Sequence, residues 1–322
     1  MKAVRAARVG GPEVLETVDL PTPAAGTGEI VVRHAAIGLN FIDIYQRSGL
    51  YPITMPAVLG QEAAGTVEAI GPGVTRFSVG DPVAYAGQIG AYSEAHAVRA
   101  DRAVRTPPGL KPEMAAASLL KGMTAEFLIR RCRPVEAGET ILVHAAAGGV
   151  GSLLVQWAKL RGAVVIGAVG SSDKAALARD LGCDHVILYR DEGVANAVRR
   201  LTDGAGVAVA FDSVGRATFE ETLASLARRG TFVSFGNASG PPPAVEPQRL
   251  ARAGSLFFTR PTLFDYIATR EALEESAAAV FALVGEGRLR VEIGQRVPLA
   301  QTAQAHAALE ARQTHGATIL IP

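Results

Sequence analysis

Only two cysteines occur in this sequence of 322 residues, and Cys132 and Cys183 stand in no metal-ligand pattern. No apolar run is long enough to cross a bilayer, and the amino terminus has no signal-peptide core. The net charge of +1 argues against the basic face that a nucleic-acid binder needs. These absences predict a cytoplasmic protein with no membrane, metal or nucleic-acid partner, in which both cysteines are small buried hydrophobic residues.

The glycine-rich segment 144–151 is the most informative part of the sequence. It follows a short apolar, β-branched run at residues 140–143 and leads into apolar residues at helical spacing over residues 150–160. A second apolar run at residues 164–169 completes the order of strand, turn, helix and strand. This order predicts a βαβ unit that binds a dinucleotide at its glycine-rich turn.

The spacing in this turn places Ala146, Gly148 and Gly151 at the three glycine positions of a dinucleotide fingerprint. We expect Gly148, Gly149 and Val150 to present backbone N–H groups to a pyrophosphate, with the positive end of the helix dipole behind them. Gly151 allows the helix to pack closely on the strand. Ala146 departs from the fingerprint and predicts a slightly different first turn.

The end of the second strand indicates which dinucleotide is bound. An acidic residue there would bind the ribose 2′-hydroxyl of NAD, but this position is Gly170. Ser171 can donate a hydrogen bond to a 2′-phosphate and Lys174 adds positive charge, so we predict NADPH as the cofactor. The alternative is that Asp173 caps a helix over residues 174–181 and that Lys174 is a solvated residue of its first turn.

Two patterns divide the chain. Residues 1–120 are rich in turns, as in an irregular β-barrel, whereas residues 121–262 alternate strands and helices, as in a doubly wound sheet. A long helix and two short strands after residue 262 are too few to fold alone, so we assign residues 263–322 to the first domain. Beyond the runs named above, strands are expected at 29–35, 65–71, 81–85, 186–189, 207–212, 230–235, 255–259, 289–293 and 317–321, and the long helix at 264–284.

With these features, the whole chain resembles the zinc-free quinone oxidoreductases of the ζ-crystallin type, within the medium-chain dehydrogenase/reductase superfamily. The resemblance rests on the segments GLNFID (38–43), RSGLYP (47–52), GQEAAGTV (60–67), GD (80–81), FDSVG (211–215) and SFGN (234–237), together with the glycine-rich turn. It implies an α/β protein that combines a GroES-like irregular β-barrel domain for the substrate, residues 1–120 and 263–322, with a Rossmann domain for NADPH, residues 121–262.

The resemblance also separates the chain from the zinc-dependent branch of that superfamily. That branch has a thiolate near the position of Asn40 and a histidine near Gln61, because a catalytic zinc needs three protein ligands and an open position. Both ligands are missing here, and so is the four-cysteine loop of a structural zinc site. No metal is therefore expected.

The resemblance assigns roles to individual residues of the cofactor site. Lys174, Tyr189 and Arg312 match residues that bind the 2′-phosphate, while Thr124, Phe235 and Asn237 match residues at the nicotinamide end. Taken alone, Tyr189 is also compatible with a half-buried strand position, and Arg312 would be an ordinary surface arginine. The full set of predicted cofactor-binding residues is Phe41, Thr124, Gly148, Gly149, Val150, Gly170, Ser171, Lys174, Tyr189, Val214, Phe235, Asn237 and Arg312.

Asn40, Tyr45 and Tyr51 match the catalytic, substrate-binding pocket of the family. Two tyrosines beside an amide suit a flat carbonyl compound, because they offer a stacking surface and hydrogen-bond donors. These three residues are equally compatible with turn and core positions. Lys121 is expected to open a helix at the domain junction, or alternatively to be a structural ion-pair partner.

The resemblance predicts NADPH-dependent reduction of quinones, without zinc, in the cleft between the two domains. Two alternatives stay open: an NADPH-dependent reductase of α,β-unsaturated carbonyl compounds, and a non-catalytic NADPH-binding protein of the crystallin or RNA-binding kind. The apolar run 255–259, at an expected sheet edge, predicts a homodimer formed through the edge strands of the cofactor domains.

Overall fold

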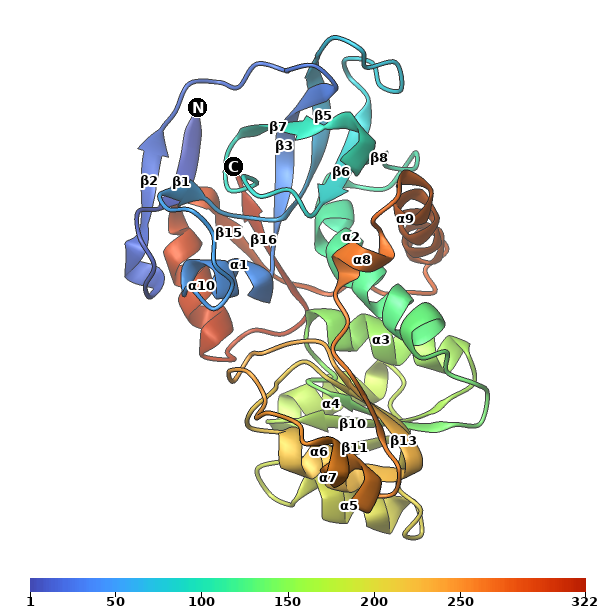
Figure 1. The fold of residues 1–322 in the computed structure, drawn as a ribbon. Coiled ribbons are helices and arrows are strands. Elements are labelled where there is room, and N and C mark those ends of the chain that lie inside the picture. Colours follow the sequence, from blue (N-terminus) through green and yellow to red (C-terminus); the bar gives the residue numbers. More distant parts are fainter. The chain divides into compact units, whose positions relative to one another are not determined.

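The computed structural model describes all 322 residues, which form two compact units (Figure 1). The barrel unit consists of Met1–Met123, Ile267–Gly287 and Val291–Pro322. The sheet unit consists of Thr124–Tyr266 and Arg288–Arg290. Each unit has its own buried apolar core.

Two sheets build the barrel unit. One has seven strands, in the order β15-β16-β3-β5-β6-β8 with β7 paired to β3, and the other has the order β2-β1-β4. Strand β3, Glu29–Leu39, continues past its predicted end because its last residues pair with the C-terminal strand β16, Ala317–Ile321. Register shifts in its pairing with β5, Glu62–Ile70, bend the sheet toward closure. The other elements are β1 (Lys2–Ala6), η1 (Pro12–Val14), β2 (Leu15–Asp19), α1 (Phe41–Arg47), β4 (Ala57–Val58), β6 (Pro82–Ala86), β7 (Ala95–Arg99), η2 (Ala100–Arg102), β8 (Ala103–Arg105), α9 (Arg270–Gly285), β15 (Ile293–Pro298), η4 (Leu299–Gln301) and α10 (Thr302–Glu310).

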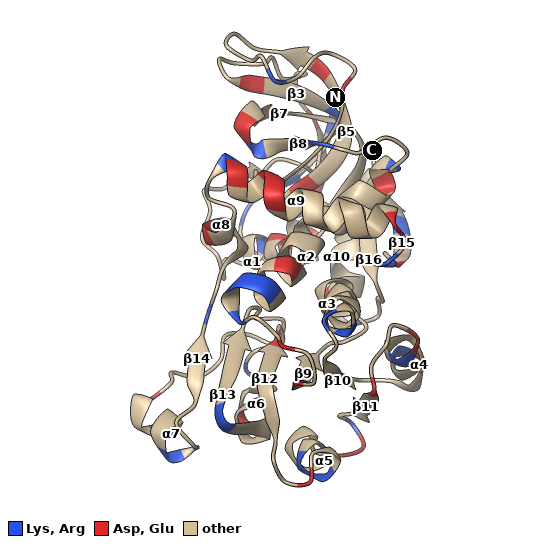
Figure 2. Ribbon diagram, turned by 90° about the vertical axis from the view of Figure 1, so that its right-hand side faces the viewer, with Lys and Arg blue, Asp and Glu red and all other residues tan.

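The sheet unit contains one parallel sheet of six strands. Their order is β11-β10-β9-β12-β13-β14, and the strand labels follow this order across Figure 2. The first strand of the sheet lies beside the fourth, as in a doubly wound nucleotide-binding fold, so the predicted Rossmann-type sheet is confirmed. The elements are η3 (Leu128–Cys132), β9 (Thr140–His144), α3 (Gly149–Leu160), β10 (Val164–Val169), α4 (Ser172–Asp180), β11 (His185–Leu188), α5 (Val194–Leu201), β12 (Val207–Asp212), α6 (Phe219–Ser225), β13 (Leu226–Ser234), α7 (Pro247–Arg252), β14 (Phe257–Thr259) and α8 (Leu263–Tyr266), and helix α2 (Pro112–Phe127) passes from one unit to the other.

The long helix predicted at residues 264–284 is wrong. The structure has the short helix α8 and the separate helix α9, which begins at Arg270. Thr269 caps α9, because its side chain accepts a hydrogen bond from the N–H group of Ala272 at 3.2 Å. Apolar residues keep helical spacing across this break, so periodicity alone does not reveal it. The strand predicted at 289–293 is also misplaced, since β15 begins only at Ile293.

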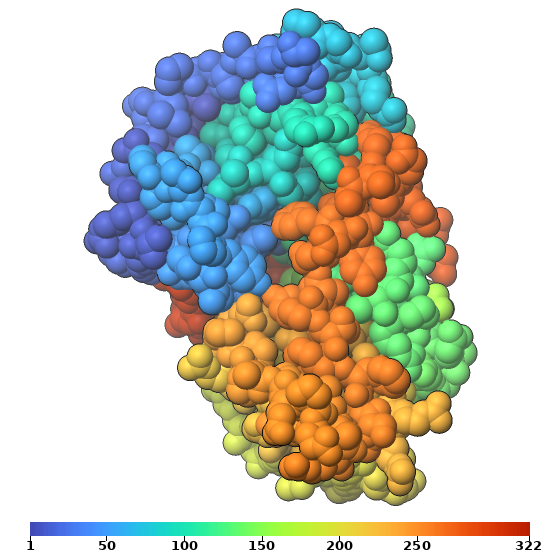
Figure 3. Space-filling view, viewed as in Figure 1, coloured from blue at the N-terminus to red at the C-terminus, as the bar shows by residue number.

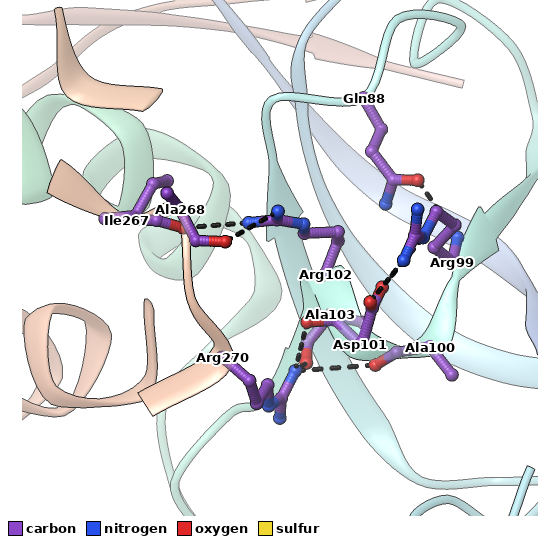
Figure 4. Close-up of polar contacts among 9 residues, drawn as sticks. All are labelled: Gln88, Arg99, Ala100, Asp101, Arg102, Ala103, Ile267, Ala268 and Arg270. Carbon is purple, nitrogen blue, oxygen red and sulfur yellow. Dashed lines mark hydrogen bonds and ion pairs between the residues drawn. The ribbon is translucent and has the colours of Figure 1, made fainter. Parts of the chain in front are cut away.

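Arginine side chains form hydrogen bonds between the barrel and the segment that connects α8 to α9 (Figure 4). Arg102 donates to the carbonyl oxygens of Ile267 and Ala268, each at 2.8 Å. Arg270 donates in return to three carbonyl oxygens of the segment 100–103. The orange residues of the α9 segment lie against the teal residues of the barrel in Figure 3. These contacts attach the returning chain to the barrel unit.

The structure also bears on two absences noted in the sequence. None of its helices combines the length and the apolar character that a membrane span requires. Both cysteines are free thiols: Cys183 is buried, as predicted, but Cys132 is only half-buried. Burial nevertheless raises the pKa of the Cys132 thiol.

Candidate functional site

The glycine-rich turn leaves three backbone amides without acceptors. Gly148 is the N-cap of α3, and no side chain caps this helix. The N–H groups of Gly149, Val150 and Gly151 donate to no carbonyl or side-chain oxygen of the protein. Such amides at a helix N-terminus suit an anion, and the helix dipole adds to the attraction. The residues therefore fit the pyrophosphate of a dinucleotide.

Close packing explains the glycine at position 151. A Cβ atom there would lie 2.1 Å from the carbonyl oxygen of Ala145, which is far too close. Ala145 itself has a φ of 51°, a left-handed conformation that costs a non-glycine residue about 1 kcal/mol. The first turn is thus altered, as Ala146 predicts, but the unusual backbone conformation lies one residue earlier, at Ala145.

Asp212, which the sequence reading missed as a site residue, shapes the neighbouring loop. It is fully buried at the end of β12, and one carboxylate oxygen accepts the N–H groups of Val214 at 2.7 Å and Gly215 at 3.0 Å. Its other oxygen accepts the hydroxyl group of Thr222 at 2.8 Å. The Thr222 hydroxyl also contacts Nε2 of His144 at 2.8 Å, and burial lowers the pKa of that histidine. Asp212 thereby fixes the loop that carries Val214.

At the end of β10, the structure contradicts the alternative in which Asp173 caps the following helix. Ser171, and not Asp173, is the N-cap of α4, and its Oγ accepts the N–H group of Lys174 at 3.4 Å. The phenol of Tyr189 covers Gly170 so closely that a Cβ atom at position 170 would lie 2.3 Å from the Tyr189 hydroxyl oxygen. The sheet unit thus brings Gly170, Ser171 and Tyr189 together. Arg312 belongs to the barrel unit, where it follows α10.

The predicted substrate residues lie on and directly beside one short helix of the barrel unit, α1. Asn40 is the N-cap of α1. The ring of Tyr45 lies 6.0 Å from that of Phe41 and 5.1 Å from that of Tyr51, measured between centroids. The N–H group of Tyr51 also donates to the carbonyl oxygen of Tyr45 at 3.0 Å. These contacts form an aromatic cluster of Phe41, Tyr45 and Tyr51.

A buried carboxylate, Glu62, organises this part of the barrel. It accepts the side-chain amide of Asn40 at 2.9 Å, the ammonium of Lys121 at 3.1 Å and the backbone N–H group of Leu120 at 2.6 Å. The Asn40 amide nitrogen also donates to the carbonyl oxygen of Gly38 at 3.3 Å. Both amide hydrogens of Asn40 are therefore used within the protein, and toward a ligand its amide is only an acceptor.

The Glu62 contact also settles two interpretations of Lys121. The ion-pair alternative is confirmed, since Lys121 and Glu62 form a buried salt bridge. The prediction that Lys121 opens a helix is wrong, because α2 begins at Pro112. Glu62 lies in the segment 60–67, which carries part of the family resemblance, but the sequence alone does not show which residues Glu62 contacts.

A chain of hydrogen bonds extends from Asn40 into the barrel. Asp43 accepts the N–H group of Asn40 and the hydroxyl of Tyr92, each at 2.9 Å. The Tyr92 oxygen lies 2.9 Å from Nε2 of His306, and Arg47 donates to Nδ1 of that ring at 3.1 Å. Burial raises the pKa of Asp43 to about 7 and, with Arg47, lowers that of His306 to about 3. Because Arg47 always donates, the neutral ring carries its proton on Nε2 and donates to Tyr92.

The residues offer no metal centre. No group of three or more His, Cys, Asp or Glu side chains lies close enough to hold a metal ion. Asn40, which stands near the position of a zinc ligand in the zinc-dependent branch, instead donates its side-chain amide to Glu62, and Glu62 also accepts the ammonium of Lys121.

Two family models match the chain. The alcohol dehydrogenase GroES-like domain matches residues 26–130, and the zinc-binding dehydrogenase model matches residues 149–282. The second description refers to a metal for which this chain has no ligand set.

Known proteins match over nearly the full length. A quinone oxidoreductase of Pseudomonas aeruginosa is 51% identical over 100% of this chain and 99% of its own. A 2-haloacrylate reductase of Burkholderia is 39% identical over 97% of this chain and 96% of its own. The crystal structure of Escherichia coli quinone oxidoreductase complexed with NADPH has a TM-score of 0.98 at 44% identity and covers 100% of both chains.

Proposed function

Because the chain belongs to the zinc-free quinone oxidoreductases of the medium-chain dehydrogenase/reductase superfamily, we propose that it reduces quinones to hydroquinones with NADPH. The observation that carries this proposal is the row of free amides at Gly149, Val150 and Gly151 in a chain that also keeps the cluster of Asn40, Tyr45 and Tyr51. The first feature suits a dinucleotide and the second a flat carbonyl substrate.

NADPH supplies a hydride when it is bound, and the chain binds and orients it. We assign its pyrophosphate to the turn of Gly148, Gly149 and Val150. Its 2′-phosphate is assigned to Gly170, Ser171, Lys174, Tyr189 and Arg312, and its nicotinamide end to Phe41, Thr124, Val214, Phe235 and Asn237. The Asp212 network supports this assignment, because it holds the backbone around Val214 in one conformation.

We assign the substrate to residues 1–120 and 263–322 and the cofactor to residues 121–262. Asn40, Tyr45 and Tyr51 then orient the quinone, which is consistent with their joint position on and beside α1. A cytoplasmic location is part of the same proposal, because NADPH and reduced thiols are available there.

A turnover assay with the purified protein tests this function. NADPH oxidation is followed by absorbance with a panel of quinones, enals and 2-haloacrylate, and NADPH binding by fluorescence. Quinone reduction supports the proposal. The similarity to a 2-haloacrylate reductase makes reduction of activated double bonds the second candidate, which turnover of enals or 2-haloacrylate alone would favour. Tight NADPH binding without any turnover would favour a non-catalytic role.

Replacing either tyrosine of the aromatic cluster by phenylalanine is expected to lower quinone turnover by less than about tenfold. A quinone that accepts hydride becomes an aromatic hydroquinone anion, which can take its proton from water, so stacking matters more than an acidic hydroxyl. Steady-state kinetics of Tyr45→Phe and Tyr51→Phe check this, with NADPH affinity as the control for folding. Loss of all turnover in either variant, with NADPH affinity intact, would favour the enone reductase, whose enolate must be protonated on carbon.

Strand β14 supports a further proposal, a homodimer through the edges of the sheets. β14 is an edge strand, and Phe257 on it is 62% exposed. An exposed apolar edge is normally paired or covered. Light scattering is expected to give a dimer for the natural protein and a monomer for Phe257→Glu. Val79→Glu, which alters an equally exposed apolar residue of the barrel unit, is the control and should remain dimeric. A natural protein that is monomeric at micromolar concentration contradicts the proposal.

A further inference from the structure

Lys121 is a buried cation that the roles assigned so far do not use. Its residue is 4% exposed, and its ammonium has three N–H donors. Glu62 accepts one of them at 3.1 Å, and no second protein acceptor lies within hydrogen-bond distance of the ammonium. Two donors of a desolvated ammonium are thus left for something other than the protein. Buried donors without acceptors are costly, so such an arrangement indicates a binding role.

The position of this ammonium is fixed relative to the proposed substrate residues. Lys121 and the Asn40 amide bond to the same oxygen of Glu62, at 3.1 and 2.9 Å, so the two nitrogens are at most about 6 Å apart. Thr124, which we assign to the nicotinamide end, follows Lys121 by one turn of α2. Asn40 has no hydrogen left to donate to a substrate. Lys121 therefore places a charged donor within about 6 Å of the Asn40 amide nitrogen.

The choice of residue supports a role beyond ion pairing. Arginine supplies most of the positive charge of this chain and is better suited to a buried pair with a carboxylate. Glu62 already receives two other donors, from Asn40 and Leu120, so it does not depend on Lys121 for hydrogen bonds. A lysine places a compact charge here and keeps donors available for a ligand. An arginine would use its donors on both carboxylate oxygens of Glu62.

We propose that Lys121 is a catalytic residue, whose ammonium donates a hydrogen bond to the quinone oxygen that becomes negatively charged on reduction. This rests on the proposed function. A hydride, with its electron pair, passes from NADPH to the quinone, so the cofactor is oxidised and the quinone becomes the hydroquinone monoanion. Lys121 keeps its proton and stabilises the new negative charge, and water supplies the proton that completes the hydroquinone. The ammonium thus takes the part that a zinc ion plays for a carbonyl oxygen.

Single-turnover kinetics test the proposal. Lys121→Met is expected to slow hydride transfer about 100-fold, the usual effect of losing one donor to a developing oxyanion. The loss should depend on the substrate. It should be largest for tetramethyl-1,4-benzoquinone, whose hydroquinone anion is basic, and smallest for tetrachloro-1,4-benzoquinone, whose anion is already stabilised. Lys111→Met, which replaces an exposed lysine just before α2, is the control and should retain the natural rate.

A second pair of variants separates catalysis from folding. Lys121→Met alone leaves the buried Glu62 carboxylate without its cation, which can destabilise the protein. The comparison is therefore made with Glu62 neutralised: Glu62→Gln keeps the ammonium, and Glu62→Gln with Lys121→Met lacks it. We expect the double variant to bind NADPH like Glu62→Gln but to transfer hydride at least tenfold more slowly. Equal rates in this pair, or an equal loss for every quinone, would overturn the role of Lys121 while leaving the proposed function intact. A natural protein that reduces no quinone would overturn both.

Discussion

Replacing Lys174 by alanine is expected to raise the Kd for NADPH by about tenfold to more than a hundredfold, and to leave the Kd for NADH nearly unchanged. A charged hydrogen bond to a phosphate contributes about 1.5–3 kcal/mol, which corresponds to that range of affinity. Lys174 lies in the first turn of α4, directly after Gly170 and the capping Ser171. Only NADPH carries the 2′-phosphate that this ammonium would meet, so the effect should be specific to it.

Fluorescence titration of both cofactors measures this difference. Arg179→Ala is a matched control, because it removes an exposed positive charge from the other end of the same helix. We expect that control to bind NADPH like the natural protein. If Lys174→Ala weakens NADPH and NADH equally, the 2′-phosphate does not bind at this lysine, and the assignment of Gly170 and Tyr189 to the same site loses its support.

Lowering the pH from 7 to 5 is expected to reduce the free energy of unfolding by about 4 kcal/mol. Burial lowers the pKa of three histidines of the barrel unit, to about 3 for His34 and His306 and to about 4 for His96, from an ordinary value of 6.5. Below pH 6.5 these histidines bind protons in the unfolded chain but stay neutral in the folded chain. The folded state is therefore destabilised relative to the unfolded state as the pH falls below 6.5. Each histidine contributes about 2 kcal/mol to this loss at pH 5.

Asp43 acts in the opposite direction. Burial raises its pKa from 3.8 to about 7, so the folded chain binds a proton between these values that the unfolded chain does not. Its effect on stability is therefore favourable at low pH and is lost as the pH rises through 7. Between pH 7 and 5, protonation of Asp43 stabilises the folded state by about 2 kcal/mol, which is smaller than the loss of stability from the three histidines.

Urea unfolding at several pH values checks the sign and the size of this dependence. In His306→Gln, the free energy of unfolding is expected to depend less steeply on pH below 6.5, by the equivalent of about one proton. The variant lacks one histidine that binds a proton only in the unfolded chain. His185→Gln changes an exposed histidine at the start of β11 and should leave the slope unchanged. Stability that stays constant or rises from pH 6.5 to 5 would show that the buried histidines gain protons without unfolding.

The sequence predicted the elements whose signal is local. The strands at 164–169, 207–212 and 317–321 have the predicted bounds, because each is a short apolar run between turn residues. It failed where a distant part of the chain decides the structure. Strand β3 is lengthened by β16, almost three hundred residues away, and the helix near residue 267 is broken where Arg102 binds its carbonyl groups.

The candidate site shows the same division. The glycine-rich turn and Gly170 were predicted because each lies within a short stretch of sequence, and the residues of the α1 cluster were predicted from the family resemblance. Glu62, Asp212 and the chain from Asp43 to His306 were missed, because a buried polar residue is recognised by its partners, which come from other elements. A carboxylate in an apolar strand, such as Glu62 or Asp212, is the available signal, since burying it without hydrogen bonds would be costly.

The contact between Gly170 and Tyr189 constrains how cofactor preference can change. Any side chain at position 170 needs the space that the Tyr189 hydroxyl occupies, since a Cβ atom there would come within 2.3 Å of it. Gly170→Asp would therefore displace the tyrosine in the same step that adds the acidic group. An evolutionary or engineered route from NADPH to NADH is consequently ordered: a smaller residue at position 189 must come first, and only then does an acidic residue at position 170 find room to bind a ribose hydroxyl.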